Sequence, residues 1–287
     1  MTDRLKRVAA IHDISGFGKC SLTVALPIIS AAGVETSVIP TAVLSTHTGG
    51  FENYTYRDLT DDILPWAAHW KSIDFDIDAF YTGFLGSYQQ IEIVSKVFDM
   101  LANNDTVRIV DPVMGDNGKL YSVFDDSFPV QMKMLCSKAD VIVPNITEAF
   151  LLLGEPFKEG PYSEELIENM LVRLSELGPE KIVLTGAYFD ESYIACICYD
   201  KKAGSTDYIY TKRIEGFFHG TGDVFASVLT ACIVKGLRLT DAVKTAADFT
   251  EQCIIRTKNA GTDVRFGVDF ETGLSGLRQM IEDNNEG

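Results

Sequence analysis

The chain repeats one pattern along most of its length: a short apolar run, then a polar loop, then a helix-like stretch. The apolar runs cover residues 8–12, 38–44, 79–86, 107–110, 141–144 and 181–186. Strands that alternate with helices of about 10–15 residues form a mostly parallel sheet with helices on both faces. The sequence therefore predicts an α/β fold in which each polar loop follows the carboxyl end of a strand.

The stretches between these runs have the apolar spacing of helices. The predicted helices cover residues 20–32, 59–70, 91–101, 149–153, 164–177, 223–234 and 240–257. Residues 192–199 and 206–214 flank a polar turn, which predicts an antiparallel pair of strands. No repeat or linker divides the chain, so residues 1–287 are expected to form one domain. Its end is predicted to hold a last short helix and an acidic tail, disordered from about residue 279.

The composition excludes several classes of function. A net charge of −16 argues against nucleic acid as a partner, because a phosphate backbone binds basic surfaces. No apolar run approaches the roughly 20 residues that span a bilayer, so no membrane partner is expected. The charged start, Met1–Arg7, leads straight into a strand, which predicts no signal peptide and a cytoplasmic location. The six cysteines include no C-x-x-C pair, which favours small buried side chains over a disulfide or metal role.

The most informative stretch is Gly220-Thr221-Gly222-Asp223, followed by an apolar run to Val234. A glycine-rich turn at the start of a helix directs free N–H groups and the positive end of the helix dipole at one point, which suits an anion. An aspartate at such a point repels a stored phosphate, but it can accept the proton of an attacking hydroxyl group. The alternative is an ordinary turn with an aspartate near a helix start.

The first strand ends in Asp13-Ile14-Ser15-Gly16-Phe17-Gly18-Lys19. Asp13 and Ser15 are predicted to line a pocket, although both are also common turn residues. Gly16 and Gly18 begin a dinucleotide fingerprint but no third glycine follows, and Gly18-Lys19 lacks the upstream glycine of a P-loop. The second strand also lacks a terminal acid, so an NAD-dependent oxidoreductase is disfavoured.

Three further loops carry side chains that could bind a metal ion, a phosphate or another ligand. Asp111 ends one strand and Asp116 lies past a proline and a glycine, which places two carboxylates of the kind Mg²⁺ prefers near one site. The alternative is two solvated turn aspartates. Asn145 and Glu148 follow the next strand, where they could bind a ligand or cap the following helix. A loop rich in hydroxyl groups, Ser45–Phe51, is expected to bind a ligand at the same edge.

These motifs occur together in one order: D-x-S-G-x-G at 13–18, H-T-G-G at 47–50, D-P-V-M-G-D at 111–116, N-x-x-E at 145–148 and G-T-G-D at 220–223. The combination resembles the ribokinase-like superfamily from about Val8 to Lys258, and within it the vitamin kinases, the pyridoxal kinases and hydroxymethylpyrimidine kinases. The resemblance implies a three-layer sandwich around a mostly parallel sheet. It also implies ATP and Mg²⁺ as cofactors and a homodimer, and some members need K⁺.

The resemblance implies a role for each motif. Asp223 matches the catalytic base, and Gly220, Thr221 and Gly222 match the anion hole for the transferring phosphoryl group. The remaining polar matches concern the metal and the nucleotide. Asp111, Asp116 and Glu148 match the acids beside Mg²⁺, while Asn145, Glu148, Thr185 and Thr221 match nucleotide-binding positions.

The substrate positions implied by the resemblance are His12, Asp13, Ser15, Leu44, His47, Thr48, Phe84, Tyr121 and Asp223. The H-T-G-G motif and Tyr121 favour a kinase acting on the hydroxymethyl group of a vitamin B6 vitamer. His12 stands where a ring-contacting serine is expected, and the 13–18 loop and His219 resemble the pyrimidine kinases. Hydroxymethylpyrimidine kinase is therefore the alternative, and a non-catalytic vitamin-binding protein is a remote one.

Overall fold

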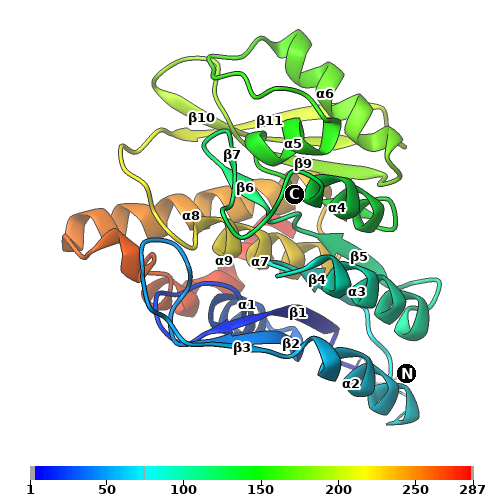
Figure 1. Ribbon diagram of the computed structural model, residues 1–287. Helices are drawn as coiled ribbons and strands as arrows, with labels where there is room; N and C mark the ends of the chain where they lie inside the picture. Colours follow the sequence, from blue (N-terminus) through cyan, green and yellow to red (C-terminus); the bar gives the residue numbers. More distant parts are fainter. Residues whose placement is uncertain (1–3, 74, 286–287) are drawn as a thin grey trace.

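The computed structural model describes residues 4–73 and 75–285, and its centre is one nine-stranded sheet (Figure 1). The strand order is β11-β10-β9-β8-β5-β4-β1-β2-β3. The strands are β1 (Arg7–Ser15), β2 (Glu35–Leu44), β3 (Tyr56–Asp58), β4 (Ala79–Thr82), β5 (Val107–Val110), β8 (Val141–Ile142), β9 (Lys181–Ala187), β10 (Tyr193–Asp200) and β11 (Ser205–Lys212). The six strands from β9 to β2 in this order pair in parallel, and the outer pairs are antiparallel.

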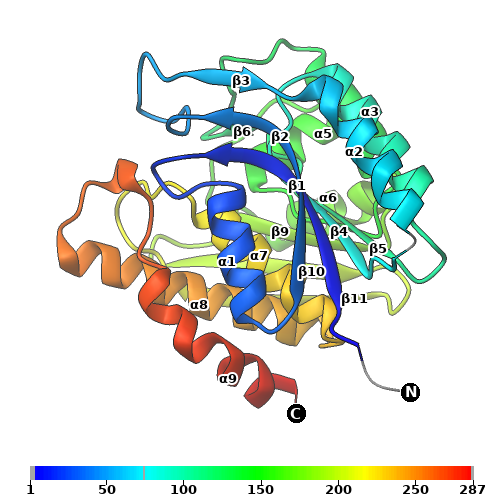
Figure 2. The ribbon, with the colours of Figure 1, turned by 90° about the horizontal axis from the view of Figure 1, so that it is seen from below.

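Helices cover both faces of the sheet, which makes the predicted three-layer sandwich. One face packs α2 (Thr60–Ile73), α3 (Tyr88–Leu101), α4 (Phe128–Cys136), α5 (Ile146–Leu153) and α6 (Glu164–Glu176). The other face packs α1 (Leu22–Ala31), α7 (Thr221–Val234), α8 (Leu239–Ala260) and α9 (Leu274–Asn285), which Figure 2 shows side by side. The predicted fold class is confirmed, and so is the antiparallel pairing of β10 with β11.

Several elements differ from the sequence-based expectation. Helix α4, edge strand β3 and a small hairpin of β6 (Gly115–Asp116) and β7 (Lys119–Leu120) were not predicted. The tail that was expected to be disordered from about residue 279 is helical to Asn285, because Leu277 and Ile281 of α9 are fully buried in the core beside α1 and α8. Residues 286–287 lie outside the described residues.

Two expectations drawn from composition can be compared with the structure. Within residues 4–73 and 75–285, no helix combines the length and apolar character needed to cross a membrane. All six cysteines are free, and four of them are buried, as the spacing of the cysteines predicted.

Candidate active site

The parallel strands bring the predicted polar loops to one edge of the sheet. The carboxyl ends of β1, β2, β4, β5, β8 and β9 all meet there, because these strands pair in parallel. Four acidic residues from different elements lie close enough to affect one another electrostatically. The charges of Glu148 and Asp223 raise the pKa of Asp111, and the charge of Asp13 raises that of Asp223. The edge is therefore a strongly acidic site.

Helix α7 begins two residues earlier than predicted, at Thr221, with Gly220 as its first flanking residue. Gly220 has a left-handed backbone with φ of 78°, and a Cβ atom there would lie 2.3 Å from the Lys19 carbonyl oxygen. Only glycine fits both conditions. A Cβ atom at Gly222 would meet nothing within 4 Å, so the space beside this residue is open. The first N–H groups of a helix have no partner within the helix, which suits them to bind an anion.

Asp223 lies in the first turn of α7 and is partly buried. Burial raises its pKa to about 7, the backbone amide of Ser21 acts against this rise, and the charge of Asp13 adds to it. A carboxyl group with a pKa near the working pH is suited to accept and release a proton. Asp223 therefore has a pKa suited to proton exchange near neutral pH, at the start of α7.

Asp13 is held by two hydroxyl groups of its own loop. Ser21 donates to one carboxylate oxygen at 2.6 Å and Ser15 to the other at 2.9 Å. Ser21 takes a backbone conformation unusual for a side-chain-bearing residue, with φ of 56° and ψ of −129°. In this strained conformation, Ser21 contacts Asp13 through its hydroxyl group and Asp223 through its own backbone amide. Sequence reasoning missed Ser21, since a serine before a helix carries no signal beyond ordinary capping.

Asn145 and Glu148 form a capping box at the start of α5. The Asn145 side chain accepts from the Glu148 N–H at 2.9 Å, and Glu148 accepts from the N–H groups of Asn145 at 2.9 Å and Met114 at 3.0 Å. The structure therefore gives this pair the helix-capping role that the sequence left as an alternative. Burial raises the pKa of Glu148, and the backbone amides act against it.

The same helix start holds the loop that carries the second predicted acid. Asn145 donates to the Gly115 carbonyl oxygen at 2.9 Å, and Thr147 accepts from the Gly118 N–H at 2.9 Å. These bonds fix the β6–β7 hairpin, and with it Asp116, beside α5. Thr185 pairs with Asn145 through an isolated bridge between neighbouring strands. The N-x-x-E motif therefore connects the metal candidates to the predicted nucleotide position.

The predicted metal acids do not form a complete metal shell by themselves. No group of three or more His, Cys, Asp or Glu side chains among the described residues is arranged to hold a metal ion. Asp111 is buried at 7% exposure, and none of the ion pairs in the described part of the chain involves Asp111 or Glu148. Burial and the neighbouring carboxylates raise the pKa of Asp111 well above its usual range. A cation bound beside these carboxyl groups would favour their ionised form, and its other ligands would come from substrate and water.

The predicted substrate residues lie around the same edge in different environments. Leu44 is buried at the end of β2, Thr48 is exposed, and Phe84 is partly buried beside Phe124, with ring centroids 5.6 Å apart. Tyr121 is 39% exposed after the β6–β7 hairpin. Thr48 and Tyr121 are therefore accessible to a ligand, whereas Leu44 is not.

His12 and His47, which were predicted to contact substrate, are both buried in the structure. His12 is completely buried, because strand β1 turns its ring against Tyr81, with centroids 4.3 Å apart, on the face covered by α7. Burial lowers its pKa to about 3, so the ring is neutral. His47 is also buried, and both of its ring nitrogens bond within the chain, to Arg265 and Gly49. In the described part of the chain, the His47 ring has no free nitrogen, whereas both ring nitrogens of His12 are buried without a hydrogen-bond partner.

Comparison with known proteins agrees with this geometry. The family model described as phosphomethylpyrimidine kinase matches residues 26–266. A hydroxymethylpyrimidine/phosphomethylpyrimidine kinase of Bacillus subtilis is 28% identical over 193 residues, 66% of this chain and 68% of that protein. The crystal structure of a "putative phosphomethylpyrimidine kinase" from Bacteroides thetaiotaomicron, in a form with pyridoxal, is 38% identical, covers 96% of each chain and has a TM-score of 0.91.

The crystal structure of pyridoxal kinase from Lactobacillus plantarum is 30% identical, covers 98% of this chain and 99% of that one, and has a TM-score of 0.88. This similarity covers nearly the whole of both chains. The chain therefore belongs to the phosphomethylpyrimidine kinase family, has the ribokinase-like fold, and is a phosphotransferase that takes an alcohol group as acceptor.

Proposed function

We propose that the chain transfers the γ-phosphoryl group of ATP to the 5′-hydroxymethyl group of a vitamin B6 vitamer: pyridoxal, pyridoxamine or pyridoxine. The observation that carries this proposal is the placement of Asp223 in the first turn of α7, where burial raises its pKa and where the space beside Gly222 is open. A binding protein has no need of a base beside an anion site. This placement favours a kinase over the vitamin-binding alternative.

In the proposed reaction, Asp223 accepts the proton of the substrate hydroxyl group, and the oxygen of that hydroxyl group attacks the γ-phosphorus atom of ATP. The bond between that phosphorus and the bridging oxygen of ADP breaks as the new oxygen–phosphorus bond forms. The N–H groups of residues 220–222 face the phosphoryl oxygens and stabilise their charge in the transition state. Burial and the charge of Asp13 keep the pKa of Asp223 high, whereas the Ser21 backbone amide lowers it. Ser21 also donates to Asp13 through its hydroxyl group, which links the two carboxyl groups.

Mg²⁺ fits the carboxyl groups at this edge. Asp111, Asp116 and Glu148 would hold it through waters and the nucleotide phosphates, whose charge it neutralises when bound. The proposed place of the nucleotide is a neighbouring cavity of about 510 Å³ at the same edge, beyond the ends of β9 and β11. Its lining combines Ile214 and Ile255 with the cations Lys212, Arg213 and Lys258 and with the acids Glu191 and Glu215. The apolar side chains suit an aromatic base and the two lysines suit its phosphates, while Arg213 already pairs with Glu191.

The choice of acceptor rests on finer evidence. The Bacteroides relative was crystallised with pyridoxal, and the Lactobacillus relative is a pyridoxal kinase. Thr48, Phe84 and Tyr121 are available to hold the pyridine ring, as the resemblance to pyridoxal kinases implied. The family description and the Bacillus relative favour the pyrimidine instead, so hydroxymethylpyrimidine kinase is the second candidate.

A panel of acceptors tests the choice directly. We expect ATP consumption by the purified chain, with Mg²⁺ and K⁺ present, to be fastest on one of the three pyridine alcohols. Hydroxymethylpyrimidine is included in the same assay at matched concentrations. Turnover on the pyrimidine alone would replace the first candidate with the second, and absence of turnover on all four would contradict both.

The pH dependence of the reaction tests the base. Because Asp223 must be ionised to accept a proton, kcat/KM for the alcohol is expected to rise with pH along a limb whose apparent pKa lies well above 3.8, toward 7. The measurement is made at saturating ATP and Mg²⁺. The residual activity of Asp223→Asn is the control and should lack this limb. A limb that stays near the ordinary aspartate value would contradict the assignment.

A further inference from the structure

His47 belongs to the H-T-G-G loop, and its ring is fully used inside the chain. Its Nε2 lies 2.7 Å from the Arg265 carbonyl oxygen, and its Nδ1 accepts from the Gly49 N–H at 3.1 Å. Because a carbonyl can only accept and an N–H can only donate, one form fits both contacts: a neutral ring with its proton on Nε2. The ring thus ties the substrate loop to a segment more than 200 positions away in the chain, and no nitrogen remains for a ligand.

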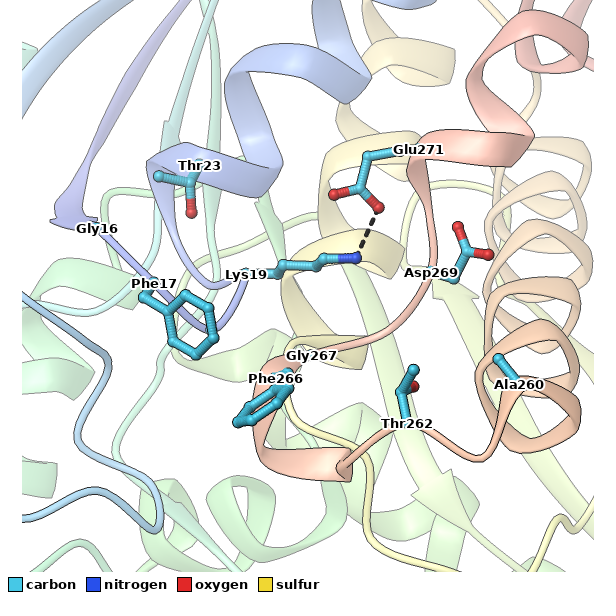
Figure 3. A pocket seen from close by; sticks show the side chains of 11 residues that line it. Gly16, Phe17, Lys19, Thr23, Ala260, Thr262, Phe266, Gly267, Asp269 and Glu271 are labelled. Atoms are coloured by element: carbon cyan, nitrogen blue, oxygen red, sulfur yellow. Dashed lines mark hydrogen bonds and ion pairs between the residues drawn. The ribbon is translucent and has the colours of Figure 1, made fainter.

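That segment is the C-terminal loop, defined here as residues 261–273 between α8 and α9. It also lies against the β1–α1 loop. Gly267 has φ of 84°, and a Cβ atom there would lie 2.5 Å from the Gly18 carbonyl oxygen and 2.6 Å from the Lys19 Cβ. The Lys19 ammonium group reaches back to Glu271 at 2.8 Å and to the Val268 carbonyl oxygen at 3.3 Å. Figure 3 shows Lys19 crossing the pocket of about 500 Å³ between the two loops.

The β1–α1 loop contacts both the C-terminal loop and the start of α7. Lys19 has a left-handed backbone, with φ of 55°, and its carbonyl oxygen is the atom that a Cβ at Gly220 would meet at 2.3 Å. One residue therefore lies against the C-terminal loop with its side chain and against the start of α7 with its backbone. The contacts form a continuous path from Arg265 and Gly267 to the turn that bears Asp223.

We propose that the C-terminal loop positions the H-T-G-G loop (residues 47–50) and the β1–α1 loop. His47 and Gly267 are its two points of attachment. His47 is a positioning residue that anchors the substrate loop to Arg265, and Gly267 supports the Gly18–Lys19 backbone beneath Gly220. The proposal rests on the kinase activity and not on which alcohol is the acceptor. A loop that lies outside the reacting groups can control turnover in this way, because a misplacement of about 1 Å can lower a rate by about 10²-fold.

Two substitutions at His47 separate positioning from substrate contact. In His47→Gln, the side-chain amide can place an N–H where Nε2 lies and so keep the bond to Arg265. In His47→Asn, the side-chain oxygen can accept from Gly49 as Nδ1 does, but the bond to Arg265 is lost. We expect His47→Asn to lower kcat by about 10- to 100-fold, whereas His47→Gln recovers most of the wild-type kcat. Equal losses in both variants through a raised KM for the alcohol would mean that His47 contacts substrate and would overturn the proposal.

Amide hydrogen exchange provides a readout that does not depend on activity. Exchange within residues 261–273 is expected to become faster in His47→Asn than in His47→Gln, while the thermal midpoint stays similar in the two variants. This comparison holds even if the wild-type chain turns over none of the tested alcohols, in which case the proposed function fails separately. Unchanged exchange in His47→Asn would overturn the anchoring role.

A second pair of variants tests the other attachment. Gly267→Ala places a methyl group against Gly18 and Lys19. We expect kcat to fall and amide hydrogen exchange in the C-terminal loop to become faster. Gly261→Ala is the matched control, because Gly261 lies in the same loop with φ of 65° and a Cβ atom there meets nothing within 4 Å. We expect Gly261→Ala to retain the wild-type kcat. Equal kcat in the two variants would contradict support of the anion site by Gly267.

Discussion

Asp223→Asn is expected to lower kcat by a factor of about 10²–10⁴ and to leave the KM for ATP nearly unchanged. The amide of asparagine keeps the size of the side chain but cannot accept the hydroxyl proton. The anion site at residues 220–222 is built from backbone groups and is not altered by the change. Steady-state kinetics with ATP and the preferred alcohol measure both parameters. Wild-type turnover in the variant would contradict the base assignment.

A stability measurement distinguishes a loss of kcat in the chemical step from a loss caused by unfolding. Burial raises the pKa of Asp223 to about 7, so the folded chain binds a proton more tightly than the unfolded chain, whose ordinary value is 3.8. Stability is therefore lost as pH rises from 3.8 through 7, and at pH 8 the ionised carboxylate disfavours folding. Asn carries no charge, so the thermal midpoint of Asp223→Asn at pH 8 should equal or exceed that of the wild type. A lower midpoint would mean that part of the lost activity reflects unfolding.

Gly220→Ala is expected to lower kcat by about 10²-fold for a different reason. The new methyl group would lie 2.3 Å from the Lys19 carbonyl oxygen, where ordinary contacts begin at 3.4 Å, so the two loops must separate by about 1 Å. That displacement moves the N–H groups of the α7 turn away from the phosphoryl group. The left-handed backbone adds a stability cost of about 1–2 kcal/mol. Kinetics and thermal unfolding of the purified variant measure the two effects.

Gly204→Ala is the matched control for the stability cost of a left-handed backbone. Gly204 has φ of 65° in the turn between β10 and β11, and a Cβ atom there meets nothing within 4 Å. It should show a comparable loss of stability with wild-type kcat. If Gly220→Ala also kept wild-type kcat, the contact between Lys19 and Gly220 would have no part in placing the anion site.

Much of the architecture could be predicted because it depends on local patterns. Apolar runs that end in polar loops indicate parallel strands, and parallel strands bring their ends to one edge whatever their order. Asp13, Asp111, Glu148 and Asp223 therefore meet as expected, although the sequence left the strand order open. The capping role of Glu148 could also be anticipated, since its spacing from Asn145 is that of a capping box.

The directions of individual side chains could not be predicted in the same way. The register shift between β1 and β2 comes after His12 and places the extra residue on β2, between Pro40 and Val43. His12 keeps the face of Val8, and its burial there depends on Tyr81 and on helix α7, which are distant in the sequence. The partner of His47 lies on a loop more than 200 residues away, and no local pattern encodes such a contact. The same holds for α9, whose burial depends on α1 and α8.

The packing of α9 against α1 also bears on how the molecule is made. Val24, Ala25 and Ile28 of α1 lie in the same core as Leu277 and Ile281 of α9 (Figure 2). During synthesis, α1 leaves the ribosome early, whereas the helix that covers it emerges only after almost every other element. Chains of this size expose apolar surface while they wait for such partners. The apolar surface of α1 therefore becomes covered in stages, by β1 and β2 first, then by α7, and last by α9.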